Sequence, residues 1–504
     1  MDLVAVILFL VLYYLRPQEW PFGLGDIRFV QIVMLAGLAS LAFRARGLHP
    51  RDLFRTPHDW AVLAFWLWLV FASPTPWNTF KESANLYIFY VVIVQTLYTV
   101  PRLQKFVGWW TFLIATIAAL ALLSLRGFDP LGSLDLTNGP MQGRLVLNLS
   151  IFNNPNALGH SLVPAIPLLY YFCIWKRSVF LRTIGIALMV MVAGCIYLTL
   201  SKGAFVSGAA TIVATLTFGR PKTVQAIIIT AAVMFGGSVL YALPRMQELN
   251  KTKTDEAIQG RIIAFRHGYK MLSTHDKGVG FRNWQTSFLA EGYRFKPTRT
   301  DEASRKKTPQ LIYKAPHSSY VGLGAELGKP GFFLFFGILY CCLRTLVTAK
   351  TRTPDEERIR RILFVLIVSY MVSSWMVDFA YRPTFFMFAA ATAALHRHLH
   401  GINEQRRRDD EEKGLQEADP PTPAWRAQLR PQPALAGALA KRGAPAAVLT
   451  LDPLPETASA PEPAALPASC IRWAWNRLGW VDIAITFAMT YAALRYWSYL
   501  ITRM

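Results

Sequence analysis

Long apolar runs alternate with short polar segments along most of this 504-residue chain. Such blocks are typical of membrane-spanning helices, because about 20 apolar residues in a helix cross a hydrocarbon core about 30 Å thick. The candidate spans are 3–15, 29–43, 60–72, 84–100, 106–125, 157–175, 179–200, 204–218, 223–243, 332–347, 362–380, 384–395 and 480–501. We therefore predict an all-α, polytopic integral membrane protein with about 12–13 transmembrane helices and one large periplasmic loop.

Lysine and arginine concentrate in every second loop between the predicted spans. The basic loops are 44–55, 102–105, 176–182, 220–222 and 350–361. Cytoplasmic loops of multi-pass proteins carry this excess, so these loops should face the cytoplasm and the intervening ones should lie outside. We expect a multi-pass protein of the bacterial inner (cytoplasmic) membrane whose active site faces the periplasm.

Composition supports the membrane class and accounts for most of the positive charge. Hydrophobic residues make up 53% of the chain and charged residues 17%, which argues against a soluble fold of this length. The formal net charge of +22 is mostly explained by the cytoplasmic loops, so we expect no nucleic-acid partner. The five cysteines lie in apolar segments or in the tail, which indicates neither a disulfide framework nor a thiolate metal site in the outer loops. The run 3–15 follows Asp2 and lacks a basic leader and a cleavage site, so it should be a retained first helix.

Segment 401–478 differs from the rest of the chain because it is rich in Pro, Ala and charged residues. Such a composition cannot bury enough apolar surface to fold, so we predict a disordered cytoplasmic linker. The linker would separate a transmembrane domain, 1–400, from an additional C-terminal transmembrane helix, 479–504.

Segment 244–316 is the large loop that the charge count places outside. It contains fifteen basic residues and seven acidic ones. Loops longer than about 60 residues escape the orientation rule, so this excess is permitted there. Two explanations stay open: a solvated face beside anionic lipid, or a funnel that attracts an anionic, membrane-bound substrate.

Two side chains of this loop have the chemistry to act on a lipid diphosphate. Apolar spacing predicts a helix over 260–272, with Arg261 near one end. A guanidinium is always charged and offers a planar fork that fits phosphate oxygens. His317 follows a proline at the start of an apolar helical pattern, where a neutral imidazole can take a proton from a sugar hydroxyl. Either residue alone could equally have only a structural role.

Several short motifs occur in a particular order, from just before the sixth predicted span to the return of the loop to the membrane. They are Phe152-Asn153-Asn154-Pro155-Asn156, Ser201-Lys202-Gly203-Ala204, Gly260-Arg261, Gly278-Val279-Gly280, His317 and Glu326-Leu327-Gly328. In this order and topology the chain resembles the O-antigen ligase and O-antigen polymerase superfamily of bacterial envelope glycan enzymes. The resemblance covers about 153–395 and rests on the order and spacing of motifs that are individually short.

The resemblance implies a role for particular residues. Lys202 and Arg261 would bind the diphosphate of an undecaprenyl-linked glycan, Arg266 and Arg282 would assist them, and the catalytic residue would be His317, the general base for an acceptor hydroxyl. No metal and no cofactor would be needed. The family often has arginine where this chain has Lys202, and an ammonium lacks the bidentate fork of a guanidinium.

The predicted function is that of a metal-independent glycosyltransferase of the membrane. A lipid diphosphate is already an activated leaving group, so positioned cations suffice and no Walker-type nucleotide loop is needed or present in the sequence. A ligase would transfer the finished glycan to lipid A-core or another acceptor, whereas a polymerase would transfer it to the next lipid-linked repeat. The late position of the single large loop favours a ligase.

Two other functional classes stay open at this point. A transporter would suit the number of spans, but transporters usually place ionisable groups at mid-membrane, and here the charges lie near span ends. A scaffold among polysaccharide assembly proteins could use segment 401–478 for docking.

Overall fold

The computed structural model describes residues 2–21, 29–43, 53–139, 141, 143–243, 246, 256–295, 310–311, 313–401 and 479–503. The predicted disordered linker, from residue 402 onward, lies outside the described residues, and so do parts of the predicted outer loop between 244 and 312. The linker therefore stays a prediction.

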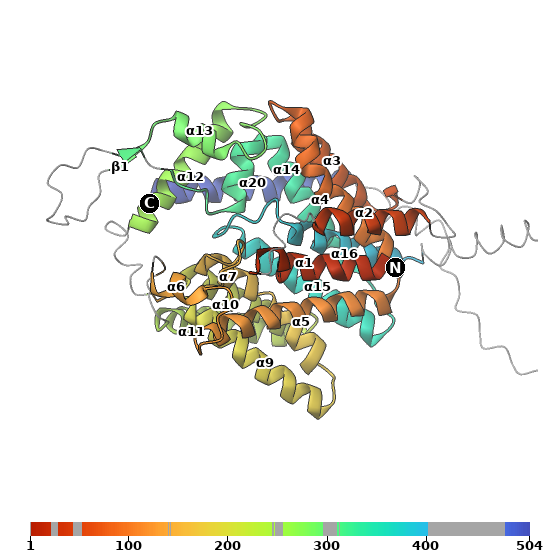
Figure 1. Ribbon diagram of the computed structural model, residues 1–504. Helices are drawn as coiled ribbons and strands as arrows, with labels where there is room; N and C mark the ends of the chain where they lie inside the picture. Colours follow the sequence, from red (N-terminus) through yellow and green to blue (C-terminus); the bar gives the residue numbers. More distant parts are fainter. Residues whose placement is uncertain are drawn as a thin grey trace, which may run out of the picture. The chain divides into compact units, whose positions relative to one another are not determined.

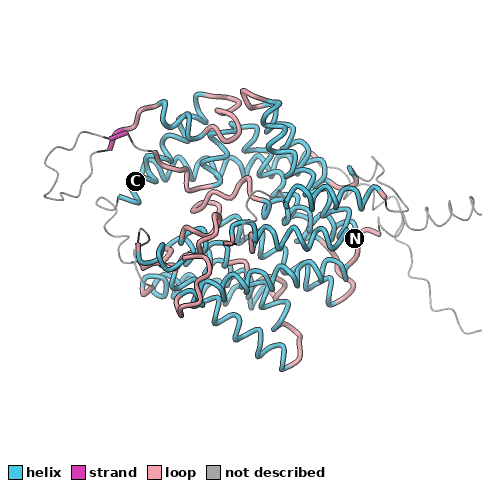
Figure 2. The backbone as a smooth tube through the Cα atoms, viewed as in Figure 1, coloured by secondary structure: helices cyan, strands magenta, loops and turns pink. Residues whose placement is uncertain are grey.

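Almost all of the regular secondary structure in the described chain is helical, which confirms the all-α prediction (Figure 1, Figure 2). The helices are α1 (Asp2–Tyr14), η1 (Pro17–Glu19), α2 (Phe29–Ala42), α3 (Pro57–Phe71), α4 (Pro76–Thr96), α5 (Val100–Ser124), α6 (Ser133–Asn138), α7 (Pro155–Leu162), α8 (Ala165–Leu169), η3 (Tyr170–Ile174), α9 (Val179–Leu198), α10 (Lys202–Thr217), α11 (Lys222–Tyr241), α12 (Glu256–Thr274), α13 (Trp284–Ala290), α14 (Ser319–Thr348), α15 (Pro354–Ser373), α16 (Pro383–Leu399) and α20 (Trp480–Arg503). Two short antiparallel strands, β1 (Arg294–Phe295) and β2 (Gln310–Leu311), pair Arg294 with Leu311.

Five helical segments of the described chain are long and apolar enough to cross a membrane. They are Val100–Ser124, Pro155–Ile174, Val179–Leu198, Lys222–Tyr241 and Ser319–Thr348. The polytopic membrane prediction is thereby confirmed. The other predicted spans also form helices, but these are shorter or more polar, so the number of about 12–13 crossings stays a prediction.

Polar residues cap the starts of two helices. Thr56 begins α3 in a capping box with Asp59, and Thr353 begins α15 in the same way with Glu356. In both cases proline follows the cap, a position where its missing N–H costs nothing. These local signals set the start of each helix independently of its packing.

Helix α14 is in contact with several other helices of the described chain. It packs against α3, α12, α15, α16 and α20. The loop between α15 and α16, residues 374–382, meets the start of α14, and α10 packs along α15. This arrangement brings the beginnings of α10 and α14 to the same short loop.

Candidate functional site

The first turn of α10 is held in place by polar contacts from α7 and the segment before it. Ser201 caps the helix by accepting a hydrogen bond from the Ala204 amide, and its Oγ donates to Asn156 Oδ1 at 2.8 Å. Arg144 donates to the same Asn156 oxygen at 2.9 Å. Asn156 therefore fixes the position of Lys202, the first residue of α10.

Two glycines allow α7 and α10 to approach closely at this turn. A Cβ on Gly159 would lie 2.9 Å from the Cβ of Ala204. A Cβ on Gly203 would lie 2.7 Å from Nε2 of His160 and 2.9 Å from Sδ of Met376. The Ser-Lys-Gly-Ala motif thus needs its glycine so that the first turn of α10 can approach His160 and the 374–382 loop.

His317 stands at the entrance to α14, as the sequence predicted, and its backbone has a left-handed φ of 48°. The two serines that follow anchor it. Ser318 Oγ donates to the Ser374 carbonyl at 3.0 Å, and Ser319 Oγ donates to the Val377 carbonyl at 2.8 Å. Because Met376 lies in this same loop, the Lys202 and His317 segments share one support. A left-handed histidine held by its surroundings is a feature often found at functional sites.

Arg261 acts electrostatically on this group from α12, which covers the predicted helix 260–272. Its side chain is half-buried, and its charge reaches both His317 and His160. Burial, followed by the positive charges of Arg261 and Lys314, lowers the pKa of His317 to about 4. The imidazole is therefore neutral at physiological pH, the form that can accept a proton.

The two predicted auxiliary arginines lie on different parts of the structure. Arg266 is exposed on α12, and five residues after Arg261 corresponds to about 140° around a helix, so the two point to different faces. Arg282 has a left-handed φ of 59°, and its Nη1 lies 3.8 Å from Oε2 of Glu82 on α4. Arg282 thus lies beside α4, where it lines a cavity described below.

The predicted Gly-x-Gly turn and Glu-x-Gly motif pack against each other. The amides of Val279 and Gly280 donate to the carbonyls of Ala325 and Glu326 at 3.0 and 2.8 Å. This contact coincides with a break in α14 at Gly328, which has a φ of 66°. The turn therefore holds α14 in place at Ala325 and Glu326, which follow His317 and precede the break at Gly328.

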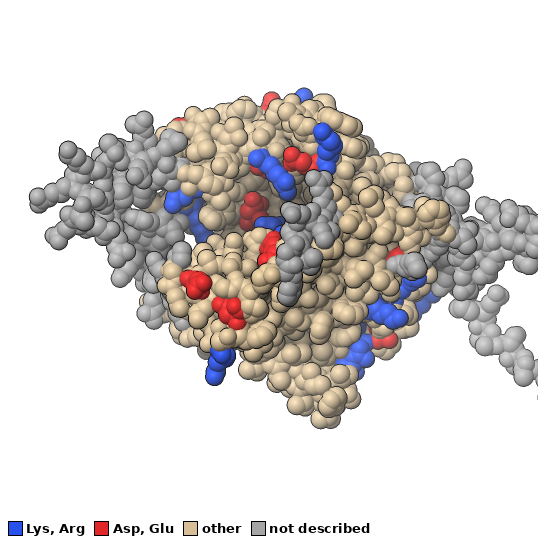
Figure 3. Space-filling view, viewed as in Figure 1, with Lys and Arg blue, Asp and Glu red and all other residues tan. Residues whose placement is uncertain are grey.

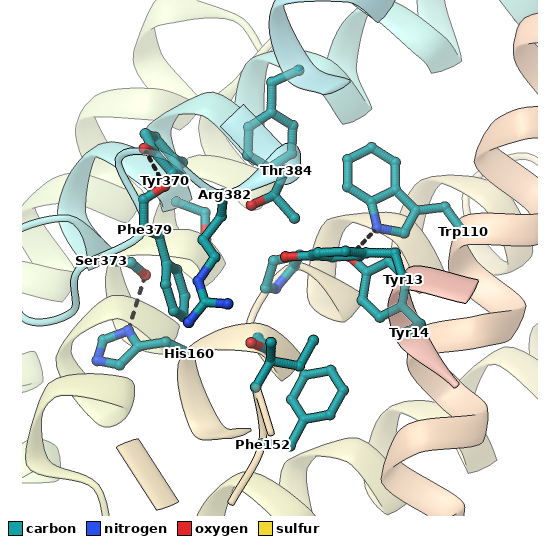
Figure 4. A pocket seen from close by; sticks show the side chains of 15 residues that line it. Tyr13, Tyr14, Trp110, Phe152, His160, Tyr370, Ser373, Phe379, Arg382 and Thr384 are labelled. Carbon is teal, nitrogen blue, oxygen red and sulfur yellow. Dashed lines mark hydrogen bonds between the residues drawn. The ribbon is translucent and has the colours of Figure 1, made fainter. Parts of the chain in front are cut away.

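Two adjoining cavities open beside this group and share Tyr13 and Arg382. In the smaller cavity Arg382 extends into the space between His160 and Tyr13, while His160 Nδ1 shares a 3.0 Å hydrogen bond with Ser373 Oγ (Figure 4). The larger cavity, about 590 Å³, has an apolar end formed by α1, α2 and α4. Its polar lining consists of Arg16, Gln18, Glu82, Asn85, Arg282, Glu326, Asp378 and Arg382.

Asp378 lines the larger cavity and lies close to Pro316, the residue before His317. Its Oδ2 would lie 3.6 Å from a Cβ on Gly322, and that Cβ would lie 3.2 Å from Cγ of Pro316, the residue before His317. The face in Figure 3 is hollowed near its centre, with acidic and basic side chains around the hollow. A polar cavity thus adjoins the segment that carries the neutral imidazole.

Sequence reasoning did not select His160, Asp378 and Arg382. His160 and Asp378 lie inside predicted spans and Arg382 lies in the short gap between two of them, so only tertiary packing shows that they belong here. Among the described residues, no three His, Cys, Asp or Glu side chains gather in a way that could hold a metal ion.

A family model described as O-Antigen ligase matches residues 166–336 of the chain. Lys202, Arg261 and His317 fall inside the matched segment, whereas α1, α4, α7 and α20 fall outside it. No curated protein matches the chain.

Proposed function

We propose that this chain is an enzyme of the O-antigen ligase and polymerase superfamily, and that it acts as a ligase of the inner membrane; the family match over residues 166–336 supports the superfamily. In this proposal it transfers a glycan from undecaprenyl diphosphate to a hydroxyl of lipid A-core or another acceptor at the periplasmic face. The observation that carries the proposal is the neutral His317 within the field of Arg261, on a segment held by the same 374–382 loop that meets the start of α10.

The donor diphosphate would lie between Arg261 and Lys202. Cations fixed at this place stabilise the negative charge that develops on the diphosphate as its bond to the sugar breaks. Arg261 suits a bidentate contact with phosphate oxygens, and Lys202 adds a compact charge at the first turn of α10, where helix amides also favour anions. No metal ion or cofactor enters this mechanism.

His317 would be the general base. The acceptor oxygen forms a bond to the anomeric carbon, the bond from that carbon to the diphosphate oxygen breaks, and the acceptor proton passes to the imidazole. Undecaprenyl diphosphate is the leaving group. A pKa of about 4 makes His317 fully available but only weakly basic, so proton transfer would accompany departure of the leaving group.

The acceptor sugar would enter from the larger cavity. Its polar lining mixes arginines, carboxylates and amides, a set that can both donate to and accept from sugar hydroxyls. Asp378 lies on the route from this cavity to the His317 segment. A polymerase would use the same chemistry with a lipid-linked repeat as the acceptor, whereas transport receives no support from the family match.

Replacing His317 with alanine in the native host tests the proposal. We expect surface glycan to be lost because the acceptor hydroxyl has no base, with at least a hundredfold lower transfer, on the order of general-base effects. On a gel, loss of a ligase leaves long glycan on the lipid carrier, and loss of a polymerase leaves acceptors that carry one repeat.

His275→Ala is the matched control, because His275 is an exposed histidine just after α12. This variant should retain the normal glycan. An unchanged glycan pattern in His317→Ala cells, with the protein present in the membrane, would refute the enzymatic assignment.

A further inference from the structure

Helix α20 lies outside the segment that matches the family, yet it packs directly against α12 and α14 (Figure 1). Its buried side chains form one stripe along the helix: Asp482, Thr486, Thr490, Ala493 and Trp497. Spacings of three and four residues place them on a single face. The opposite face is exposed and apolar, with Val481 and Phe487 among its residues. The stripe therefore defines a specific docking face.

The far end of this stripe is a tryptophan inserted between the two helices that carry the proposed site. Trp497 is fully buried, and its indole N–H donates to the Phe265 carbonyl of α12 at 3.1 Å. Phe265 is one helical turn beyond Arg261. The indole thus contacts the backbone that directly supports Arg261.

Glycines on both partner helices make room for the indole. A Cβ on Gly268 of α12 would lie 3.0 Å from Cζ2 of Trp497, and a Cβ on Gly324 of α14 would lie 2.9 Å from its Cζ3. Trp497 belongs to the same buried cluster as Phe265, Val321 and other apolar residues of α12, α13 and α14. The Trp497 indole therefore sets the separation between the middle of α12 and the beginning of α14.

The near end of the stripe is attached to α14 by charge. Arg344 Nη1 lies 2.8 Å from Oδ2 of Asp482, and the Tyr340 hydroxyl donates to Oδ1 at 2.8 Å. Asp482 is 6% exposed, so its charge needs these partners. A buried ion pair of this kind fixes the register of one helix on another. α20 is thereby held to α14 at both ends and to α12 at one.

We infer that α20 is a strut that holds α12 on α14, and that Trp497 is a positioning residue for Arg261 relative to His317. The catalytic part of this inference, the positioning of Arg261 relative to His317, rests on the proposed function. The mechanical part, the holding of α12 on α14 by α20, does not. Misplacement of a binding group by about 1 Å can lower a rate by about a hundredfold, so a fixed separation between the two helices matters for transfer.

The mechanical part is tested by hydrogen exchange on the purified full-length protein with Trp497→Ala or Trp497→Phe. We expect amides of α12 to exchange about tenfold faster in the alanine variant, because the indole and its hydrogen bond are gone. The phenylalanine variant keeps most of the packing and loses only the N–H donor. Its exchange rate in α12 should therefore lie between those of the wild type and the alanine variant. α5 is the internal reference, and Trp480→Ala, at an 86% exposed position of the same helix, is the control.

Unchanged exchange in α12 for both Trp497 variants would overturn the strut. The catalytic part is then tested by glycan transfer in cells. The transfer rate of Trp497→Ala should be lower than that of the wild type by about tenfold or more, whereas Trp497→Phe should retain most of the wild-type activity. Faster exchange with unaltered transfer would overturn the positioning role. Failure of the proposed function is distinguishable, because it shows as unaltered glycan in His317→Ala cells.

Discussion

At the scale of single residues, the environment of His317 decides which chemistry is open to it. Its pKa is lowered to about 4 first by burial and then by Arg261 and Lys314. The same positive charges that would attract a diphosphate therefore keep the adjacent imidazole unprotonated. The cation site thus favours the neutral base beside it, because each positive charge disfavours the imidazolium form.

Changing Lys314 to Gln should move the acid limb of the pH profile. Lys314 lies beside Gly260, with its Cε 3.0 Å from a Cβ built there, and its charge lowers the pKa of His317. Without this charge the pKa rises, so His317 becomes protonated at a higher pH and activity is lost earlier on acidification. The rate above pH 7 should stay close to that of the wild type. The measurement is glycan transfer against pH in proteoliposomes.

Lys277→Gln is the control for this experiment, because Lys277 is exposed in the next loop and does not contribute to the lowered pKa of His317. Its acid limb should coincide with that of the wild type. An acid limb in Lys314→Gln at the wild-type position, or at lower pH, would contradict the electrostatic account.

At the scale of elements, the sequence predicted those features that depend on local patterns. The helix around Arg261, the helix start after His317 and most predicted spans are present because apolar spacing and caps act within one segment. The meeting of the Gly278-Val279-Gly280 turn with the break at Gly328 was not predictable. It depends on a contact between segments about 50 residues apart, and periodicity carries no such information.

A pair of glycine substitutions tests how much this contact contributes. Gly278 and Gly292 both have a left-handed φ, 76° and 63°, so alanine is strained at each. A Cβ on Gly278 would lie 2.4 Å from the Glu326 carbonyl group, whereas a Cβ on Gly292 meets nothing within 4 Å. Gly292→Ala should lower the free energy of unfolding by about 1–2 kcal/mol, the conformational cost alone.

Gly278→Ala should lower the free energy of unfolding by at least about 3 kcal/mol, because the turn must also move away from α14. Thermal unfolding of the two purified variants in detergent measures the difference. Equal losses for both would show that the contact between the turn and α14 is loose.

At the scale of the whole molecule, the proposed site uses elements from far outside the family segment. His160 of α7 lies beside Gly203 at the start of α10, and α1, α2 and α4 line the larger cavity. The motifs therefore indicated the proposed donor-binding residues, which lie within the matched segment, but gave no sign of the cavity. Its residues come from separate helices with no shared pattern in the sequence, and only packing unites them.

The cavity predicts that α4 influences acceptor use. Asn85 lines the cavity, and Asn78, which is also exposed on α4, does not. Asn85→Ala should raise the KM for the acceptor about tenfold, the cost of about one lost hydrogen bond to a sugar hydroxyl, and excess acceptor should restore the rate. Asn78→Ala should behave as the wild type. Transfer measured against acceptor concentration separates this effect from a donor defect, since added acceptor cannot repair weak diphosphate binding. A transfer rate in Asn85→Ala that stays low at every acceptor concentration would contradict this prediction and place the cavity on the donor side. The residues that bind the acceptor, and so distinguish a ligase from a polymerase, would then lie elsewhere in the molecule.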